Sequence, residues 1–331
     1  MARPLAPPAE ALGVARPMRD VPVAVSACLL GEPVRFDSGH KRSALCHERL
    51  GDLFRYVPLC PEVAIGMGVP REPIRLVGNA QAYRAAGVRS PMLDPTAALR
   101  TYADEIVQAQ RHVICGYLFM KNSPSCGMER VKVYSSAGAP VANGPGIYAG
   151  SVLAQLPWLP AEESGRMNEA RLRENFVTRA LTVAHWRALE HAGMTRQRLI
   201  AFHSCYKFLL LAHGATAYKA AGRLLSDLSG DLAEKAAAYF ELLMAALAKP
   251  ATRRGHANVL QHLQGYVSDA LDAPTRAELG ASITSYRRGE VPLIVPMTLL
   301  RHLLRRFPDA YATAQVYLDP HPPALGLRNE I

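Results

Sequence analysis

Three short apolar segments in the first half of the chain are each followed by a loop that contains a cysteine. The segments are rich in β-branched and aromatic residues and lie at residues 21–26, 54–59 and 112–119. Nearly continuous apolar runs of this length are typical of strands that are covered on both faces. The cysteines that follow them are Cys28, Cys60 and Cys126. Because the carboxyl ends of parallel strands meet at one edge of a sheet, the sequence predicts that these three thiols lie close together.

The pattern of the chain changes near residue 160. Before this point the strand-like segments alternate with helical patterns such as residues 97–111, which favours an α/β domain with a mostly parallel, Rossmann-like sheet. After it Gly and Pro become rarer and amphipathic segments follow one another, so we expect an all-α second half. The helices of that half are expected at residues 166–192, 195–213, 231–248, 256–271 and 296–306.

These patterns predict an α/β domain over residues 20–160 and an all-helical domain over residues 166–331. Residues 1–19 are rich in Pro, Ala and Arg and lack a continuous apolar core, which favours a disordered leader over a signal peptide. No apolar run reaches the roughly 18–20 residues that a membrane span needs. We therefore expect a cytoplasmic protein without a membrane partner, and its oligomeric state stays open.

The six cysteines of this 331-residue chain favour thiols that pack, react or bind metal over a disulfide framework. Structural zinc sites usually have four ligands, and the chain has no CxxC pair. A cubane iron–sulfur cluster is normally held by four cysteines, and three cysteines would leave one iron open to a substrate as a Lewis acid. The alternative is that each cysteine packs as a small hydrophobic residue. We expect this alternative for Cys46, Cys115 and Cys205.

The loops around the first three cysteines resemble those of the thiouracil desulfidase family. This resemblance spans residues 20–156 and rests on the motifs SACLLGEPVRFDSG, CPEVAIGMGVPREPIRL and KNSPSCG. From about residue 170 the chain resembles a helical domain that is often fused to this family. The motifs that carry this second resemblance are FHSCYKFLLLAHGATAY, NVLQHLQGY, YRRGEVPLIVPMTLLRH and LRNEI. One departure is Phe36, where the family often has a tyrosine.

The resemblance implies a [4Fe-4S] cluster held by Cys28, Cys60 and Cys126, with one iron free to take the sulfur of a substrate. A soft sulfur suits such an iron. It further implies a desulfidase that hydrolyses the C=S bond of thiolated pyrimidines to C=O and releases sulfide. The fused proteins look like enzymes that act on 4-thiouridine in tRNA, and free thiouracil is the rival substrate. The alternative from another class is a tRNA-binding iron–sulfur redox sensor without turnover.

Hydrolysis of a thiocarbonyl needs a base for the water and a proton donor for the ring. Glu62, two residues from a cysteine ligand, is the candidate base, and Ser123 is the candidate for orienting the water. Two further serines are expected to contact the substrate, Ser26 and Ser125. The ordinary alternatives are that the serines satisfy loop backbone groups, and that the carboxylate pairs with Arg71 or Arg75.

Positive charge is concentrated in the helical half. Residues 166–331 hold 21 Lys and Arg against 14 Asp and Glu, whereas residues 1–165 hold 17 against 14. Such an excess favours a polyanionic partner such as tRNA, with tyrosines stacking on unpaired bases. The alternative is a scaffold with solvated polar faces and tyrosines in the core. The candidate RNA-binding residues are Lys207, Arg254, Arg301 and Arg305, and the tyrosines considered are Tyr206, Tyr218, Tyr266 and Tyr286.

Overall fold

The structure is a computed structural model that describes residues 8–329 and forms two compact units. The strand-containing unit is Met18–Phe176. The helical unit joins the residues up to Pro17 with those from Val177 onwards. Residues 1–7 of the predicted leader and the last two residues of the LRNEI motif lie outside the described part.

The first unit is built on a parallel sheet with the strand order β2-β1-β5-β8. Its strands are β1 (Val21–Ser26), β2 (Phe54–Leu59), β5 (Tyr117–Phe119) and β8 (Ala161–Glu163). The predicted α/β fold with a parallel sheet is therefore confirmed, and β1 and β2 have the predicted bounds. Strand β5 is shorter than the predicted run because residues 112–116 form a turn and bend before it.

A second sheet, which the sequence analysis did not predict, has the order β4-β3-β6-β7. Its strands are β3 (Ile74–Gly78), β4 (Tyr83–Gly87), β6 (Val131–Tyr134) and β7 (Pro140–Gly144). The β3–β4 and β6–β7 pairs are antiparallel, whereas β3 and β6 are parallel. The segments that follow the second and third cysteine loops thus pair with each other, which ties those loops to a common support.

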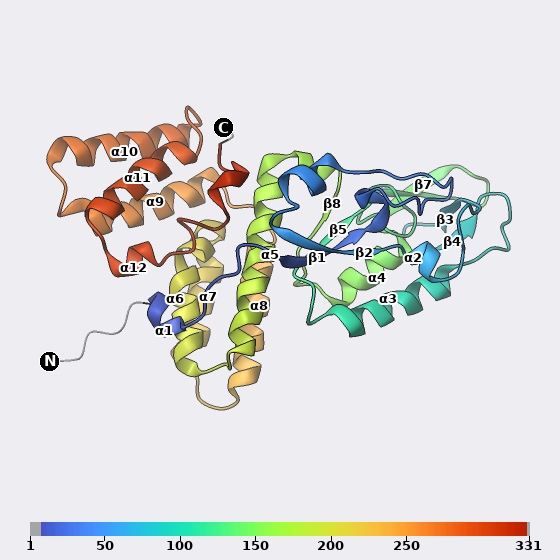
Figure 1. The fold of residues 1–331 in the computed structure, drawn as a ribbon, viewed down its shortest axis with the longest axis horizontal. Helices are drawn as coiled ribbons and strands as arrows, with labels where there is room; N and C mark the ends of the chain where they lie inside the picture. The colour runs from blue at the N-terminus through green and yellow to red at the C-terminus, as the bar shows by residue number, and fades with distance from the viewer. Residues whose placement is uncertain (1–7, 330–331) are drawn as a thin grey trace. The chain divides into compact units, whose positions relative to one another are not determined.

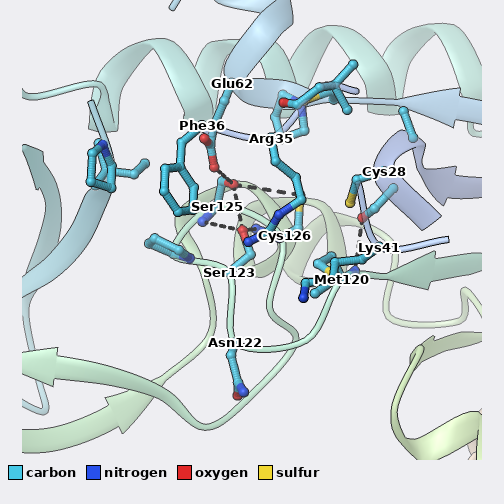
Figure 2. A pocket seen from close by; sticks show the side chains of 18 of the residues that line it. Cys28, Arg35, Phe36, Lys41, Glu62, Met120, Asn122, Ser123, Ser125 and Cys126 are labelled. Atoms are coloured by element: carbon cyan, nitrogen blue, oxygen red, sulfur yellow. Dashed lines mark hydrogen bonds between the residues drawn. The ribbon is translucent and has the colours of Figure 1, made fainter. Parts of the chain in front are cut away.

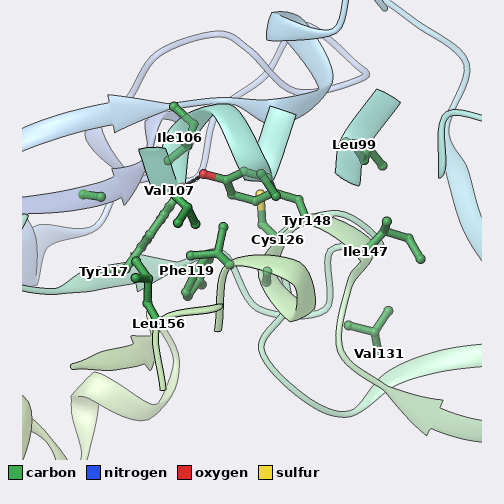
Figure 3. Packing of buried hydrophobic residues seen from close by; sticks show 14 of the residues in the cluster. Leu99, Ile106, Val107, Tyr117, Phe119, Cys126, Val131, Ile147, Tyr148 and Leu156 are labelled. Atoms are coloured by element: carbon green, nitrogen blue, oxygen red, sulfur yellow. Dashed lines mark hydrogen bonds between the residues drawn. The ribbon is translucent and has the colours of Figure 1, made fainter. Parts of the chain in front are cut away.

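Helices α3 (Thr96–Gln110) and α4 (Ile147–Gln155) lie side by side in the same unit (Figure 1). Their apolar faces share one core cluster with Tyr117 of β5, as Figure 3 shows. Cys126 is part of this cluster and is only 6% exposed. The loop of the third cysteine is therefore anchored in the core, although Cys126 and the residues before it line a cavity.

The described part of the second unit contains no strand and consists of helices, as predicted. Its long helices are α5 (Ala170–His191), which begins in the first unit, α6 (Arg196–His213), α7 (Ala215–Ser226), α8 (Leu232–Leu247), α9 (Arg253–Ser268), α10 (Ala273–Arg288) and α11 (Ile294–Arg306). A short helix α12 (Ala310–Thr313) follows them. Trp186 lies in the core, with its ring 5.2 Å from that of Phe202 and 5.0 Å from that of Phe240. None of the described helices is long and apolar enough to span a membrane.

The N-terminal segment differs from the predicted disordered leader. It contains a short helix α1 (Pro8–Leu12) that packs against α6, and Leu12 is 2% exposed. Farther along, the carbonyl of Val14 lies 3.4 Å from Nε2 of His185, and Arg16 donates to the carbonyl of Asp319. A few apolar residues in a Pro- and Ala-rich stretch become ordered because their partners come from helices far along the chain.

Candidate functional site

The three cysteines of the sequence motifs lie at the carboxyl ends of adjacent parallel strands. Cys28 is in a 3-10 turn (Ala27–Leu30) directly after β1, and Cys60 precedes the short helix α2 (Pro61–Ala64) after β2. Cys126 lies in the loop that follows β5. All three line a single cavity of about 460 Å³, part of which is drawn in Figure 2. The structure thus brings together three thiols that are up to 98 residues apart in the sequence.

The donor set and the size of the cavity fit a metal cluster. Within residues 8–329, no three His, Cys, Asp or Glu side chains converge closely enough to hold a single metal ion. The three thiols instead stand around a space that suits a larger group, and sulfur is the ligand that iron–sulfur clusters take. The other three cysteines are buried and do not line the cavity.

Burial controls the protonation of the three thiols. It raises the pKa of Cys28 to about 11, against the opposing effect of the nearby Arg35 guanidinium. Burial also raises the pKa of Cys60 and that of Cys126. These groups are therefore neutral thiols at physiological pH.

Glu62 connects the second and third cysteine loops. Its Oε1 accepts a 2.5 Å hydrogen bond from Oγ of Ser125, and its Oε2 accepts one of 2.7 Å from Nε of Arg71. The side chain of Glu62 is 13% exposed and lines the cavity. The ion pair with Arg71, considered above as the ordinary alternative, is present, and Arg75 is not the partner. The ion pair with Arg71 holds Oε2 of Glu62, and Oε1 is directed to Ser125 of the third loop.

The serines of the third loop have both structural and cavity-facing roles. Oγ of Ser123 accepts from the backbone N–H of Cys126 at 3.0 Å and lies 3.0 Å from Oγ of Ser125. Oγ of Ser125 lies 3.7 Å from Sγ of Cys126. Ser26 accepts from the N–H of Met120 at 3.0 Å, and all three serines line the cavity. Figure 2 shows Ser123, Ser125 and Glu62 as a connected series beside Cys126.

Several cavity residues were not singled out as site residues from the sequence. Arg71 is buried at 5% exposure and also donates to the carbonyls of Gly68 and Val34, so it joins two of the cysteine loops. Arg35 and Lys121 also line the cavity. Their position inside the sequence motifs could have identified these residues as candidates. The position in a motif does not, however, show in which direction a side chain points.

The third cysteine loop rests directly on the start of α4. The N–H of Ala149 donates to the carbonyl of Ser125 at 3.0 Å, and the N–H of Gly146 donates to the carbonyl of Gly127 at 2.8 Å. A Cβ at Gly146 would lie 2.6 Å from the carbonyl oxygen of Ser125, which is closer than real Cβ contacts come. Only glycine lets the two backbones approach this closely.

We expect Gly146→Ala to lower the free energy of unfolding by about 1–3 kcal/mol, because the added methyl group must displace backbone. Thermal unfolding and iron content after reconstitution measure the two consequences, and both should fall. Gly265→Ala is the matched control, because a Cβ there meets nothing within 4 Å. Equal stability of the Gly146→Ala and wild-type proteins would show that the loop does not depend on this close approach.

The four candidate RNA-binding residues differ in their surroundings. Arg254 and Arg305 are exposed. Lys207 is half-buried, with its Nζ 5.7 Å from the ring centroid of Tyr218. Arg301 is paired with Asp319 at 2.6 Å and has a side chain only 20% exposed, so its charge is already balanced.

The four tyrosines considered for base stacking also differ in their exposure. Tyr206 and Tyr286 are buried in the helical core. Tyr266 is 43% exposed, and Tyr218 is half-buried. Only the last two therefore retain ring surface that a base could use for stacking.

Comparison with known proteins assigns both halves of the chain. Residues 23–164 match the family described as 2-thiouracil desulfurase. Residues 207–322 match DUF1722, a family described as a protein of unknown function. The match to the first family covers the three cysteine loops and both sheets.

Individual relatives are each similar to part of the chain. The uncharacterized protein YbgA of Escherichia coli is 34% identical over 165 residues, which are 49% of this chain and 98% of YbgA. The uncharacterized protein YbbK of Bacillus subtilis is 30% identical over 116 residues, covering 32% of this chain and 72% of YbbK. Among solved structures, the [4Fe-4S]-dependent thiouracil desulfidase TudS is 29% identical, with 45% of this chain and 94% of that chain covered and a TM-score of 0.34. The chain belongs to the 2-thiouracil desulfurase family and carries a DUF1722 region in its helical half.

Proposed function

We propose that this protein is a [4Fe-4S]-dependent desulfidase that hydrolyses the C=S bond of thiolated pyrimidines to C=O. We further propose that 4-thiouridine in tRNA is the substrate of the two-domain chain. The observation that carries the first proposal is one cavity that joins Cys28, Cys60 and Cys126 to the hydrogen-bonded carboxylate of Glu62. Membership of the 2-thiouracil desulfurase family supports the same reaction.

Cys28, Cys60 and Cys126 would hold the cluster. When bound, a cluster with three thiolate ligands supplies an open iron that draws electron density from the thiocarbonyl sulfur of the substrate. Water provides the oxygen that replaces the sulfur, and sulfide leaves with the protons of the water, so the overall reaction is a hydrolysis without change of oxidation state.

The residues of the chain account for the movement of protons. In this proposal Glu62 Oε1 accepts a proton from the attacking water, because Oε2 is held by Arg71. The hydroxyl of Ser125 donates a hydrogen bond to Oε1 of Glu62. A water molecule that replaced Ser125 as the donor would therefore meet a carboxylate whose orientation is already fixed. Ser123, 3.0 Å from Ser125, is placed to orient that water. A redox sensor would not need this arrangement, which is why the carboxylate–serine series favours an enzyme.

The helical half supports tRNA as the larger substrate. Its charge excess exceeds that of the first half, and Arg254 and Arg305 present exposed positive charge. Lys207 lies near the rings of Tyr218 and Tyr311, and Tyr266 stacks on Tyr311 at 5.8 Å between ring centroids. A lysine among partly exposed aromatic rings suits a phosphate and an unpaired base.

The direct test is sulfide release by the anaerobically reconstituted full chain. Thiolated tRNA and free 2-thiouracil are supplied in parallel, and sulfide is measured together with loss of the thiocarbonyl absorbance. We expect release from both, with the higher kcat/KM for tRNA. Release from 2-thiouracil alone would overturn the tRNA proposal, and release from neither would overturn the desulfidase proposal.

Binding of tRNA to the helical half is expected to depend steeply on salt, because phosphate contacts release counterions. Arg254→Ala and Arg305→Ala should each weaken tRNA binding and reduce the slope of log K against log salt by about 1. Neither change should alter kcat for free 2-thiouracil. The control is Arg89→Ala, which removes an exposed arginine from the other unit. Filter binding across a salt series would contradict the proposal if the slopes of the helical-half variants matched that of the control.

A further inference from the structure

The cavity of the three cysteines contains one feature that its cluster chemistry does not explain. Its lining consists mainly of thiols, hydroxyls, cations and aliphatic side chains, and Phe36 is the single aromatic ring among the described lining residues. Phe36 is 38% exposed, whereas many of the large apolar side chains of this unit are buried. An exposed aromatic side chain inside a cavity points to a ligand that covers it.

We infer that Phe36 is the stacking surface for the pyrimidine ring of the substrate. This inference rests on the proposed desulfidase function and adds the group that recognises the base. A thiopyrimidine is a flat ring, and its hydrogen-bonding groups lie at its edge. Hydrogen bonds alone would therefore leave both faces of the ring without a contact. A phenyl ring in the cavity covers one face and fixes the plane in which the thiocarbonyl lies.

The backbone around Phe36 is held firmly enough to define that plane. Its carbonyl accepts from the N–H of Arg71 at 3.0 Å. Ser38 donates to the carbonyl of Arg35 at 3.0 Å, which closes the turn that presents the ring. The guanidinium carbon of Arg35 lies 5.5 Å from the ring centroid. Both the ring and the candidate base therefore depend on one residue, since the side chain of Arg71 holds Glu62 while its backbone holds Phe36.

Phe36, Glu62 and Ser125 line the same cavity and are labelled in Figure 2. A pyrimidine stacked on this ring would lie in the cavity that Glu62, Ser125 and the three cysteines also line. The same placement would serve a free base and a base within RNA, because stacking on a phenyl ring does not depend on what the base is attached to.

The test compares two substitutions at this position in the reconstituted holoenzyme. Stacking of a base on an aromatic side chain contributes about 1–3 kcal/mol, which corresponds to a factor of roughly 5 to 150. We expect Phe36→Leu to raise KM for 2-thiouracil by that factor, with kcat changed less than about threefold and iron content unchanged. Phe36→Tyr keeps the ring and should retain the KM of the wild type. Met92→Ala, at a residue 94% exposed and away from the cavity lining, is the control.

Binding of the product base gives a second measurement that does not require turnover. Equilibrium dialysis with labelled uracil should show a dissociation constant raised by a similar factor in Phe36→Leu and unchanged in Phe36→Tyr. A Phe36→Leu protein with wild-type KM and uracil affinity would overturn this inference while leaving the desulfidase proposal intact. A wild-type protein that neither releases sulfide nor binds uracil would overturn both.

Discussion

Protein with Cys28, Cys60 or Cys126 replaced by serine is expected to contain no iron–sulfur cluster after anaerobic reconstitution. Each thiol lines the same cavity, and a hydroxyl group is a poor replacement for a soft thiolate ligand. The wild-type protein should bind about four irons per chain, in keeping with a [4Fe-4S] centre, and show the broad brown absorbance of such a centre. Iron analysis and the visible spectrum measure the effect directly.

The chain provides its own controls for this prediction. Cys46, Cys115 and Cys205 are buried but lie outside the cavity lining, so their serine variants should keep the iron. Any loss of stability in these controls reports the cost of burying a hydroxyl group. Stoichiometric zinc without iron in the wild-type protein, or full iron content in a variant of the first three cysteines, would contradict the proposed ligand set.

Replacing Glu62 with glutamine is expected to lower kcat by about 10²–10⁴ while the cluster stays in place, because a positioned proton acceptor is lost without loss of volume. The amide keeps an oxygen that can accept from Ser125, so the third loop should keep its position. Sulfide release and iron content, measured on the same preparation, separate catalysis from assembly. Glu105→Gln, at an exposed carboxylate on α3, is the control for removal of one negative charge.

The ion pair with Arg71 makes this experiment decisive. If Glu62 served only as the partner of that buried arginine, glutamine would lower the melting temperature and leave kcat unchanged. Removal of one partner of a buried pair leaves the other charge uncompensated and is costly to stability. A variant with a lowered melting temperature and wild-type turnover would therefore move the base assignment to another group.

The local pattern of the sequence was sufficient for two of the parallel strands and for several helices of the second half. Strands β1 and β2 and helix α6 were placed almost residue by residue, and the patterns of β1 and α6 reflect burial against neighbouring layers. Helices α7 and α10 were not predicted. Helix α10 carries Gly280, Ser282 and Thr284 in its interior, residues with weak helix propensity, so packing on α9 and α11 outweighs local preference there.

For the site, the sequence by itself determined which chemistry is available. Three cysteines after three strand-like runs indicate a shared thiol site, because parallel topology brings the ends of adjacent strands together. Only the tertiary structure decided the orientation of the remaining groups. The direction of the Glu62 carboxylate, the joining of loops by Arg71 and the exposure of the Phe36 ring depend on contacts between residues far apart in the chain. Contacts of this kind produce no periodic pattern in the sequence. Each is formed between two loops, and the distance between those loops is set by the sheets to which they are connected.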